Sequence, residues 1–253
     1  MQFPAIKEIN FVKSPIRKLR SDLQRLWNRK VYKIDPEELK KYWPPEDPYD
    51  IPAWDQYWIN QMDPDNFPLF NDMFCHDEKF MERIIHLNFK TILCVGNGIS
   101  QEPRALARAG LQVTAMDFSP KATEIANYIE MDPKYYQDVF PSYTERLGGS
   151  VKFVVGDVFD PTVCPGPYDV IIERLTMQNY PEQDQPRFLE TISARLNPEG
   201  IFYSHAHSAT IKGLDALYGQ REKLFEGTKW TEWNGGPGSK PPGQVVWFFT
   251  SSG

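Results

Sequence analysis

The sequence predicts an α/β protein with a doubly wound, mostly parallel β-sheet and an antiparallel last strand. Between residues 89 and 205, short runs rich in valine and isoleucine alternate with helical patterns, as in repeated strand–helix units. The helical stretches begin or end at Ser-Pro, Gly or Asn-Pro, which are common starts and stops of helices. The final aromatic run follows a loop rather than a helix, so we expect it to return antiparallel at an edge of the sheet.

The predicted elements follow one another along this central zone. The strands are TILCVG (91–96), LQVTAMD (111–117), VKFVVGD (151–157), YDVIIE (168–173) and GIFYSHA (200–206), with QVVWFFTSS (244–252) as the last one. The helices between them are QEPRALARAG (101–110), PKATEIANYIEMD (120–132) and PRFLETISARLN (186–197). Ser119 and Pro120 open the second helix as an N-cap followed by a first-turn proline.

The first 70 residues differ from the central zone and predict an N-terminal helical cap (1–70) on a core formed by residues 71–253. The stretch IPAWDQYWINQMD places Trp54, Tyr57 and Trp58 on one face if it is helical. We expect this face to close over a ligand pocket. Large aromatic side chains also commonly pin an extension to a core, and the sequence leaves both roles open.

A basic helical pattern lies at residues 14–33, where isoleucine and leucine recur at helical spacing. Residues 1–33 contain nine Lys and Arg against two acidic residues. Such a helix can bind anionic lipid or nucleic acid, or it can dock its apolar stripe on protein. We favour docking, onto the acidic body or onto a second subunit, so homo-oligomer formation stays open.

Composition limits the class of protein. The chain has 253 residues, a formal net charge of −6 and a pI near 5.3, which argues against nucleic acid as a general partner. Its three cysteines are widely spaced and favour a reducing compartment over a disulfide framework. No apolar run approaches the roughly 20 residues of a membrane-spanning helix, and the first residues lack the apolar centre of a signal peptide. We therefore expect a cytoplasmic protein.

A glycine turn follows the first predicted strand, in the stretch ILCVGNGIS. Gly96 and Gly98 permit unusual φ values and close approach of a ligand to the backbone. Asp117 ends the second strand and Asp157 ends the third. Because ligands of open α/β sheets bind beyond the carboxyl ends of the strands, the turn and the two carboxylates predict one ligand crevice.

These residues carry a resemblance to a known family. ILCVGNGISQEPRALARAG, LQVTAMDFSP, VKFVVGDVFD and YDVII together resemble the class I S-adenosylmethionine-dependent methyltransferases, which have a Rossmann-like fold. The resemblance covers roughly residues 85–205 and implies S-adenosyl-L-methionine as the cofactor. It implies a glycine turn beneath the methionine part, an acid at the ribose and an acid at the adenine. The cofactor-binding residues carried over by position are Gly96, Asn97, Gly98, Asp117, Phe118, Asp157 and Val158.

The chain departs from the family pattern at two positions. Cys94 stands where the family usually has an acid that anchors the turn or the amino group of the cofactor, and Ser100 stands where it often has a third glycine. Glu102 is a candidate to replace that acid. These departures keep open a methyltransferase-like binding or assembly protein that does not catalyse. A second alternative is a nicotinamide-dependent oxidoreductase, whose fingerprint needs glycine where this chain has Gln101.

The candidate catalytic residues lie at the ends of the fourth and fifth strands. Glu173 could orient an acceptor or accept its proton, and His205 and His207 point the same way on a continuing strand. We predict no metal, since no third ligand is near the two histidines. Without an NPPY or DPPY sequence after strand four, a small-molecule acceptor is the default interpretation. The predicted substrate contacts are Arg174, Tyr180, Trp54 and Trp58.

Overall fold

The structure is a computed structural model that describes residues 44–62, 84, 89–129, 148–207, 228–232 and 244–251. The predicted basic helix at residues 14–33 lies outside the described residues, as do most of the predicted cap and Trp27 and Trp43.

The described strands form a seven-stranded sheet with the order β3-β2-β1-β4-β5-β7-β6. They are β1 (Thr91–Val95), β2 (Gln112–Asp117), β3 (Ser150–Val155), β4 (Tyr168–Arg174), β5 (Leu196–His207), β6 (Thr228–Glu232) and β7 (Gln244–Ser251). Strands β1 to β5 pair in parallel, and β7 pairs antiparallel with β5 and β6. The predicted fold class, a doubly wound and mostly parallel sheet, is confirmed.

Two details of the C-terminal strands differ from the prediction. The sequence analysis missed β6, a five-residue strand, and placed β7 at the edge of the sheet. Instead, β7 lies between β5 and β6. Strand β5 also begins at Leu196 rather than Gly200, because a register shift against β4 accommodates the residues around Pro198. A proline without an N–H can sit at such an irregularity.

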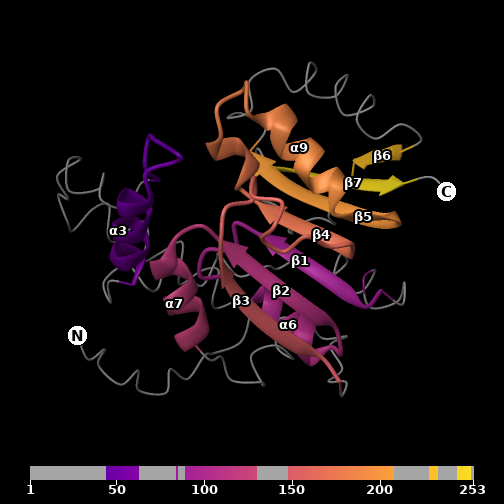
Figure 1. Cartoon of the computed structure of the whole chain (residues 1–253), viewed down its shortest axis with the longest axis horizontal. Helices are drawn as coiled ribbons and strands as arrows, with labels where there is room; N and C mark the ends of the chain where they lie inside the picture. Colours follow the sequence, from indigo (N-terminus) through magenta and orange to yellow (C-terminus); the bar gives the residue numbers. More distant parts are fainter. Residues whose placement is uncertain are drawn as a thin grey trace, which may run out of the picture.

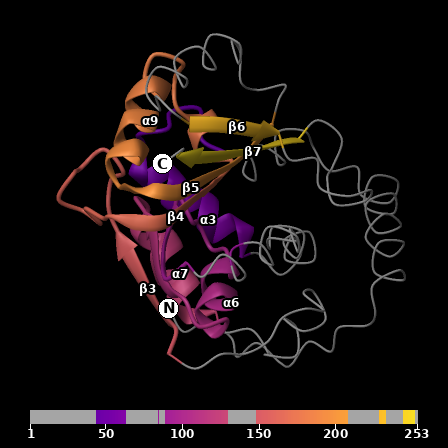
Figure 2. The same ribbon diagram turned by 90° about the vertical axis from the view of Figure 1, so that its right-hand side faces the viewer.

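Helices cover both faces of the sheet (Figures 1 and 2). Helix α6 (Glu102–Arg108) packs on one face against side chains such as Leu106, Val113 and Ile172. Helix α9 (Gln185–Ala194) packs on the other face with Phe188 and Ile192. Burial on both faces explains why the central strands are continuous apolar runs rather than alternating ones.

Two further helices lie together at the carboxyl ends of β1 and β2. They are α3 (Ile51–Gln61) and α7 (Pro120–Tyr128), which pack against each other (Figure 1). Ser119 caps α7 as predicted, since its side chain accepts a hydrogen bond from the N–H of Ala122 (3.0 Å). Among the described residues, no helix is long and apolar enough to cross a bilayer.

Candidate functional site

The glycine turn joins β1 to α6 and is held against the end of β2. Gly96 and Gly98 have φ values of +59° and +53°, a region that side chains with a Cβ rarely adopt. The N–H of Asn97 donates to the carbonyl of Met116 (3.0 Å), which ties the turn to the neighbouring strand. The two glycines therefore meet a real conformational need.

Both glycines also contact large neighbours. A Cβ built on Gly96 would lie 2.2 Å from Oγ1 of Thr176, and one built on Gly98 would lie 2.3 Å from a ring carbon of Trp58. Thr176 comes from the turn after β4 and Trp58 comes from α3. The side of the turn where a Cβ would point is therefore covered by protein, and a ligand has to use the peptide groups.

Asp117 links the turn to α7 from the end of β2. Its Oδ2 accepts a hydrogen bond from the N–H of Gly98 (2.7 Å), and its Oδ1 accepts one from the N–H of Ser119 (2.9 Å). Burial raises its pKa to about 6, opposed by these two hydrogen bonds and reinforced by the nearby charge of Asp55. Each oxygen of this carboxylate retains acceptor capacity for a ligand.

The neighbouring strand brings a second carboxylate to the same edge. The N–H of Gly156 donates to the carbonyl of Asp117 (2.9 Å), so the chain beyond β3 stays beside β2. Asp157 is exposed and accepts a hydrogen bond from the N–H of Phe159 (2.8 Å), while Val158 is buried in the core. Two carboxylates thus end adjacent strands, one buried and one open to solvent.

The turn after β4 is organised by Glu173, which is fully buried. Its Oε2 accepts hydrogen bonds from the N–H groups of Thr176 (3.0 Å) and Met177 (3.2 Å), and its Oε1 accepts one from the hydroxyl of Ser204. Between them, Leu175 has a φ of +58°, a strained value for a side chain of this kind. Glu173 therefore fixes the turn that brings Thr176 to Gly96.

Arg174 ends β4 next to the first turn of α6. Its Nη1 lies 3.9 Å from Oε2 of Glu102, a residue that is only 5% exposed. The other oxygen of Glu102 is buried and has no hydrogen-bond partner among the described residues. A cation and a carboxylate thus lie side by side next to the glycine turn.

Tyr180 ends the short 3-10 turn after β4 and lies in an aromatic group. Its ring packs with those of Tyr49, Phe159 and Phe188 at centroid distances of 5.9, 5.1 and 5.7 Å. Burial raises the pKa of Tyr180, and the carboxylates around it, Asp157 first, add to the effect. The phenol therefore stays protonated and can donate a hydrogen bond.

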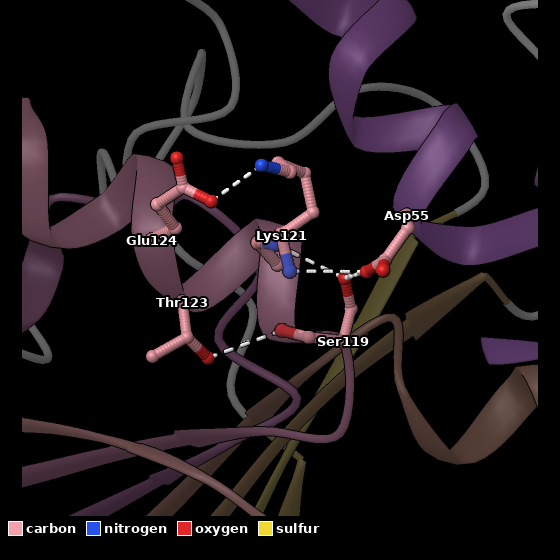
Figure 3. Close-up of polar contacts among 6 residues, drawn as sticks. Asp55, Ser119, Lys121, Thr123 and Glu124 are labelled. Carbon is pink, nitrogen blue, oxygen red and sulfur yellow. Dashed lines mark hydrogen bonds and ion pairs between the residues drawn. The ribbon is translucent and has the colours of Figure 1, made fainter. Parts of the chain in front are cut away.

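A segment before the sheet, residues 44–62, reaches both sides of this edge, and we refer to it as the strap. At one end, the hydroxyl of Tyr49 donates to Asp184, the N-cap of α9. At the other, Oδ1 of Asp55 on α3 accepts hydrogen bonds from the hydroxyl of Ser119 and the N–H of Lys121 (3.0 Å), as Figure 3 shows. The strap is thus fixed at the starts of α9 and α7.

The aromatic face predicted for the strap is present on α3. Trp54 and Trp58 are buried, and Trp54 meets Phe118 edge-on at 5.9 Å. Neither indole N–H has a hydrogen-bond partner among the described residues. These tryptophans pin α3 to the body, and both of them hold an unused donor near the glycine turn.

His205 and His207 lie on β5, where the backbone places His205 beside Arg174 on one side and Val246 on the other. His207 is opposite Gln244. Strand β5 therefore brings both residues to the carboxyl edge, as predicted. Among the described residues, no group of three His, Cys, Asp or Glu side chains could hold a metal ion.

The sequence analysis did not single out Thr176 or Asp55. Thr176 is an ordinary residue of a loop, and only its contact with Gly96 gives it weight. Asp55 sits between two tryptophans in AWDQYW, on the helical face next to theirs. A carboxylate beside an aromatic helical face indicates a possible contact with the N-terminus of another helix.

One comparison with known proteins identifies a family for the central part of the chain. The family model described as a methyltransferase domain matches residues 93–204, from within β1 to within β5. A search of curated proteins finds no match.

Solved structures show the same fold at low identity. A TehB-like S-adenosylmethionine-dependent methyltransferase from Corynebacterium glutamicum is 18% identical, with 80% of this chain and 98% of that chain covered and a TM-score of 0.54. A chain from the complex of the Haloferax volcanii Trm112 methyltransferase activator with a putative methyltransferase is 16% identical, with 79% and 98% covered and a TM-score of 0.52. The methyltransferase domain of bacterial CtHen1 is 11% identical, with 70% and 97% covered and a TM-score of 0.51.

The matched region holds the glycine turn, the two strand-end carboxylates and the turn after β4. Residues 93–204 thus match a methyltransferase domain, and together with the shared fold they support a class I S-adenosylmethionine-dependent methyltransferase whose cofactor is S-adenosyl-L-methionine.

Proposed function

We propose that this chain transfers the methyl group of S-adenosyl-L-methionine to a small-molecule acceptor at the carboxyl edge of its sheet. The observation that carries the proposal is Asp117, a buried carboxylate that joins the glycine turn to α7 beside a second strand-end acid, Asp157. The bound cofactor supplies an electrophilic methyl group, so the protein has to bind, orient and exclude water.

The residues of the turn and the strand ends fit the parts of the cofactor. Asp117 accepts from the ribose hydroxyls, while the peptide groups of residues 96–98 support the methionine part. Asp157 is exposed and suits the adenine amino group. Phe118 and the backbone of Val158 follow these two carboxylates directly in the chain and are assigned to the same part of the cofactor. A carboxylate with free lone pairs at each of two adjacent strand ends supports this placement.

The acceptor pocket lies, in this proposal, between the strap and the ends of β4 and β5. Trp54 and Trp58 offer apolar faces and unpaired indole donors, and Tyr180 offers a protonated hydroxyl. Such a lining suits a small, partly apolar molecule with a hydrogen-bond acceptor.

Proton transfer, where the acceptor needs it, is assigned to the end of β5. His205 and His207 are the candidate bases, since imidazole titrates near neutral pH. The hydrogen bonds that Glu173 accepts from Thr176, Met177 and Ser204 favour a positioning role for this residue rather than proton transfer.

The test is the affinity for S-adenosylhomocysteine, the demethylated cofactor, measured by titration calorimetry. Asp117→Ala removes the ribose contact, and we expect a loss of about 100-fold or more, since hydrogen bonds to a charged group contribute roughly 1.5–3 kcal/mol each. Glu124→Ala changes an exposed carboxylate on the same helix pair and serves as the control. Unchanged affinity in Asp117→Ala would contradict the ribose assignment.

Turnover is then measured as release of S-adenosylhomocysteine with panels of small amines, phenols, carboxylic acids and thiols. A panel member that accelerates release identifies the acceptor class. Release that responds only to proteins or nucleic acids, and to no small molecule, would contradict the acceptor proposed here.

A further inference from the structure

The chain lacks an acid at the end of β1, because Cys94 is buried there among apolar side chains. A cofactor with an α-amino-acid group still has to place one ammonium and one carboxylate beside the glycine turn. Each of these groups loses its water there, so each needs an oppositely charged partner in the protein.

We propose that Glu102 and Arg174 form this partner pair, with Glu102 binding the ammonium and Arg174 binding the carboxylate of the methionine group. The assignment rests on the proposed cofactor site. It also gives Arg174 a role toward the cofactor, rather than the acceptor contact that the sequence analysis predicted.

The position of the pair supports the assignment. Glu102 is the first residue of α6, four residues after Gly98. Arg174 is the last residue of β4, and its neighbour Glu173 pairs in register with Val95 at the end of β1. The two charged groups therefore come from different elements, the start of α6 and the end of β4, and lie side by side near the glycine turn.

The contacts of Glu102 indicate a missing partner. One of its oxygens is buried without a hydrogen-bond partner among the described residues. The other lies 3.9 Å from Arg174, beyond the distance of a charge-assisted hydrogen bond. A buried carboxylate in this state is costly, and an ammonium that donates to both oxygens would satisfy it.

The local backbone holds Glu102 in place. The hydroxyl of Ser100 accepts a hydrogen bond from the N–H of Glu102 (3.2 Å), and Pro103 follows directly in the first turn of α6. A proline in this position restricts the backbone of the residue before it. The Cα of Glu102 is thus held in a defined position close to the glycine turn.

The experiment compares two nucleosides on the whole chain. S-adenosylhomocysteine carries the amino-acid group, and 5′-methylthioadenosine has the same adenosine and sulfur without it. We expect wild type to bind S-adenosylhomocysteine more tightly. In Glu102→Gln and in Arg174→Gln this affinity should fall about 10- to 100-fold, while the affinity for methylthioadenosine should stay within about two-fold.

Glu124→Gln serves as the matched control, since Glu124 is an exposed carboxylate that pairs with Lys121. Thermal unfolding without ligand shows whether each variant is folded. Equal losses for both nucleosides in a folded variant would mean a structural role and overturn the assignment, as would unchanged binding of S-adenosylhomocysteine. If wild type binds neither nucleoside, the proposed cofactor site fails and this assignment fails with it.

Discussion

Replacing Gly98 by alanine is the most direct test of how the glycine turn meets the strap. Gly98 has a φ of +53°, and its added Cβ would lie 2.3 and 2.6 Å from two ring carbons of Trp58. The substitution therefore adds two separate costs, one from the backbone conformation and one from the collision. The ring cannot yield easily, because Trp58 is buried and also packs against Trp54 and Tyr57.

The size of the effect follows from these two contributions. A left-handed conformation costs an alanine about 1–2 kcal/mol, and overpacking of a filled site costs about 1–3 kcal/mol. We therefore expect Gly98→Ala to lower the free energy of unfolding by about 2–5 kcal/mol. The assay is urea denaturation, and an unchanged m-value shows that the substitution altered stability alone.

Gly148 provides the matched control. Its φ is +94°, but a Cβ built there meets no atom within 4 Å. Gly148→Ala should therefore show a conformational cost without a collision. Because the φ of Gly148 lies farther from the left-handed region than that of Gly98, the excess cost of Gly98→Ala over Gly148→Ala is a lower bound for the collision with Trp58.

A double-mutant cycle separates the collision from other effects. In a Trp58→Leu background, Gly98→Ala should cost only about 1–2 kcal/mol, whereas a Thr176→Ala background should leave its full cost in place. Equal costs at Gly98 and Gly148, with no change in the Trp58→Leu background, would refute the contact between α3 and the turn.

Three other perturbations have defined outcomes. The pKa of Asp117 is raised from 3.8 to about 6 in the folded chain, so between these pH values the folded state binds more protons than the unfolded state. The free energy of unfolding should therefore fall by about 3 kcal/mol as pH rises from about 4 to 6. Urea denaturation of Asp117→Asn should no longer show this fall. Asp55→Ala removes both hydrogen bonds that Asp55 on α3 accepts from the start of α7. It should lower the free energy of unfolding by about 1–3 kcal/mol and speed the dissociation of S-adenosylhomocysteine in stopped flow. The exposed control Glu124→Gln should do neither. Glu173→Ala leaves the N–H groups of Thr176 and Met177 without their acceptor and should lower the unfolding free energy by about 2–4 kcal/mol; a stability equal to wild type would rule out its positioning role.

The core of the fold was predictable because the central strands β1 and β4 are buried on both faces. Their short apolar runs, closed by Gly96 and Glu173, are the local result of that burial. The alternation with helices then leaves few topologies to consider. Strand β6 was not predictable in the same way, because five residues with charged and polar members depend on β7 for pairing.

The site was predictable where backbone conformation demands a residue type, as at Gly96 and Gly98. It was not predictable where the function of a residue depends on its partners. Glu173 is predicted from its place at a strand end to orient an acceptor or accept its proton, while the structure shows that its carboxylate is fully buried and holds a turn. Glu102 could be named from the sequence as a candidate to replace the acid missing at position 94, but its burial and its approach to Arg174 are visible only in the structure.

Strand β6 reaches the sheet only through β7, although it precedes β7 in the chain. These two strands can therefore join the growing sheet only as a unit, after residues 244–251 have been synthesised. A product that stops before residue 244 would leave the backbone N–H and C=O groups of β5 without the partner strand that now pairs with Ile201 to His207. Such an unpaired edge is a template for pairing with another chain, so a truncated product should aggregate more readily.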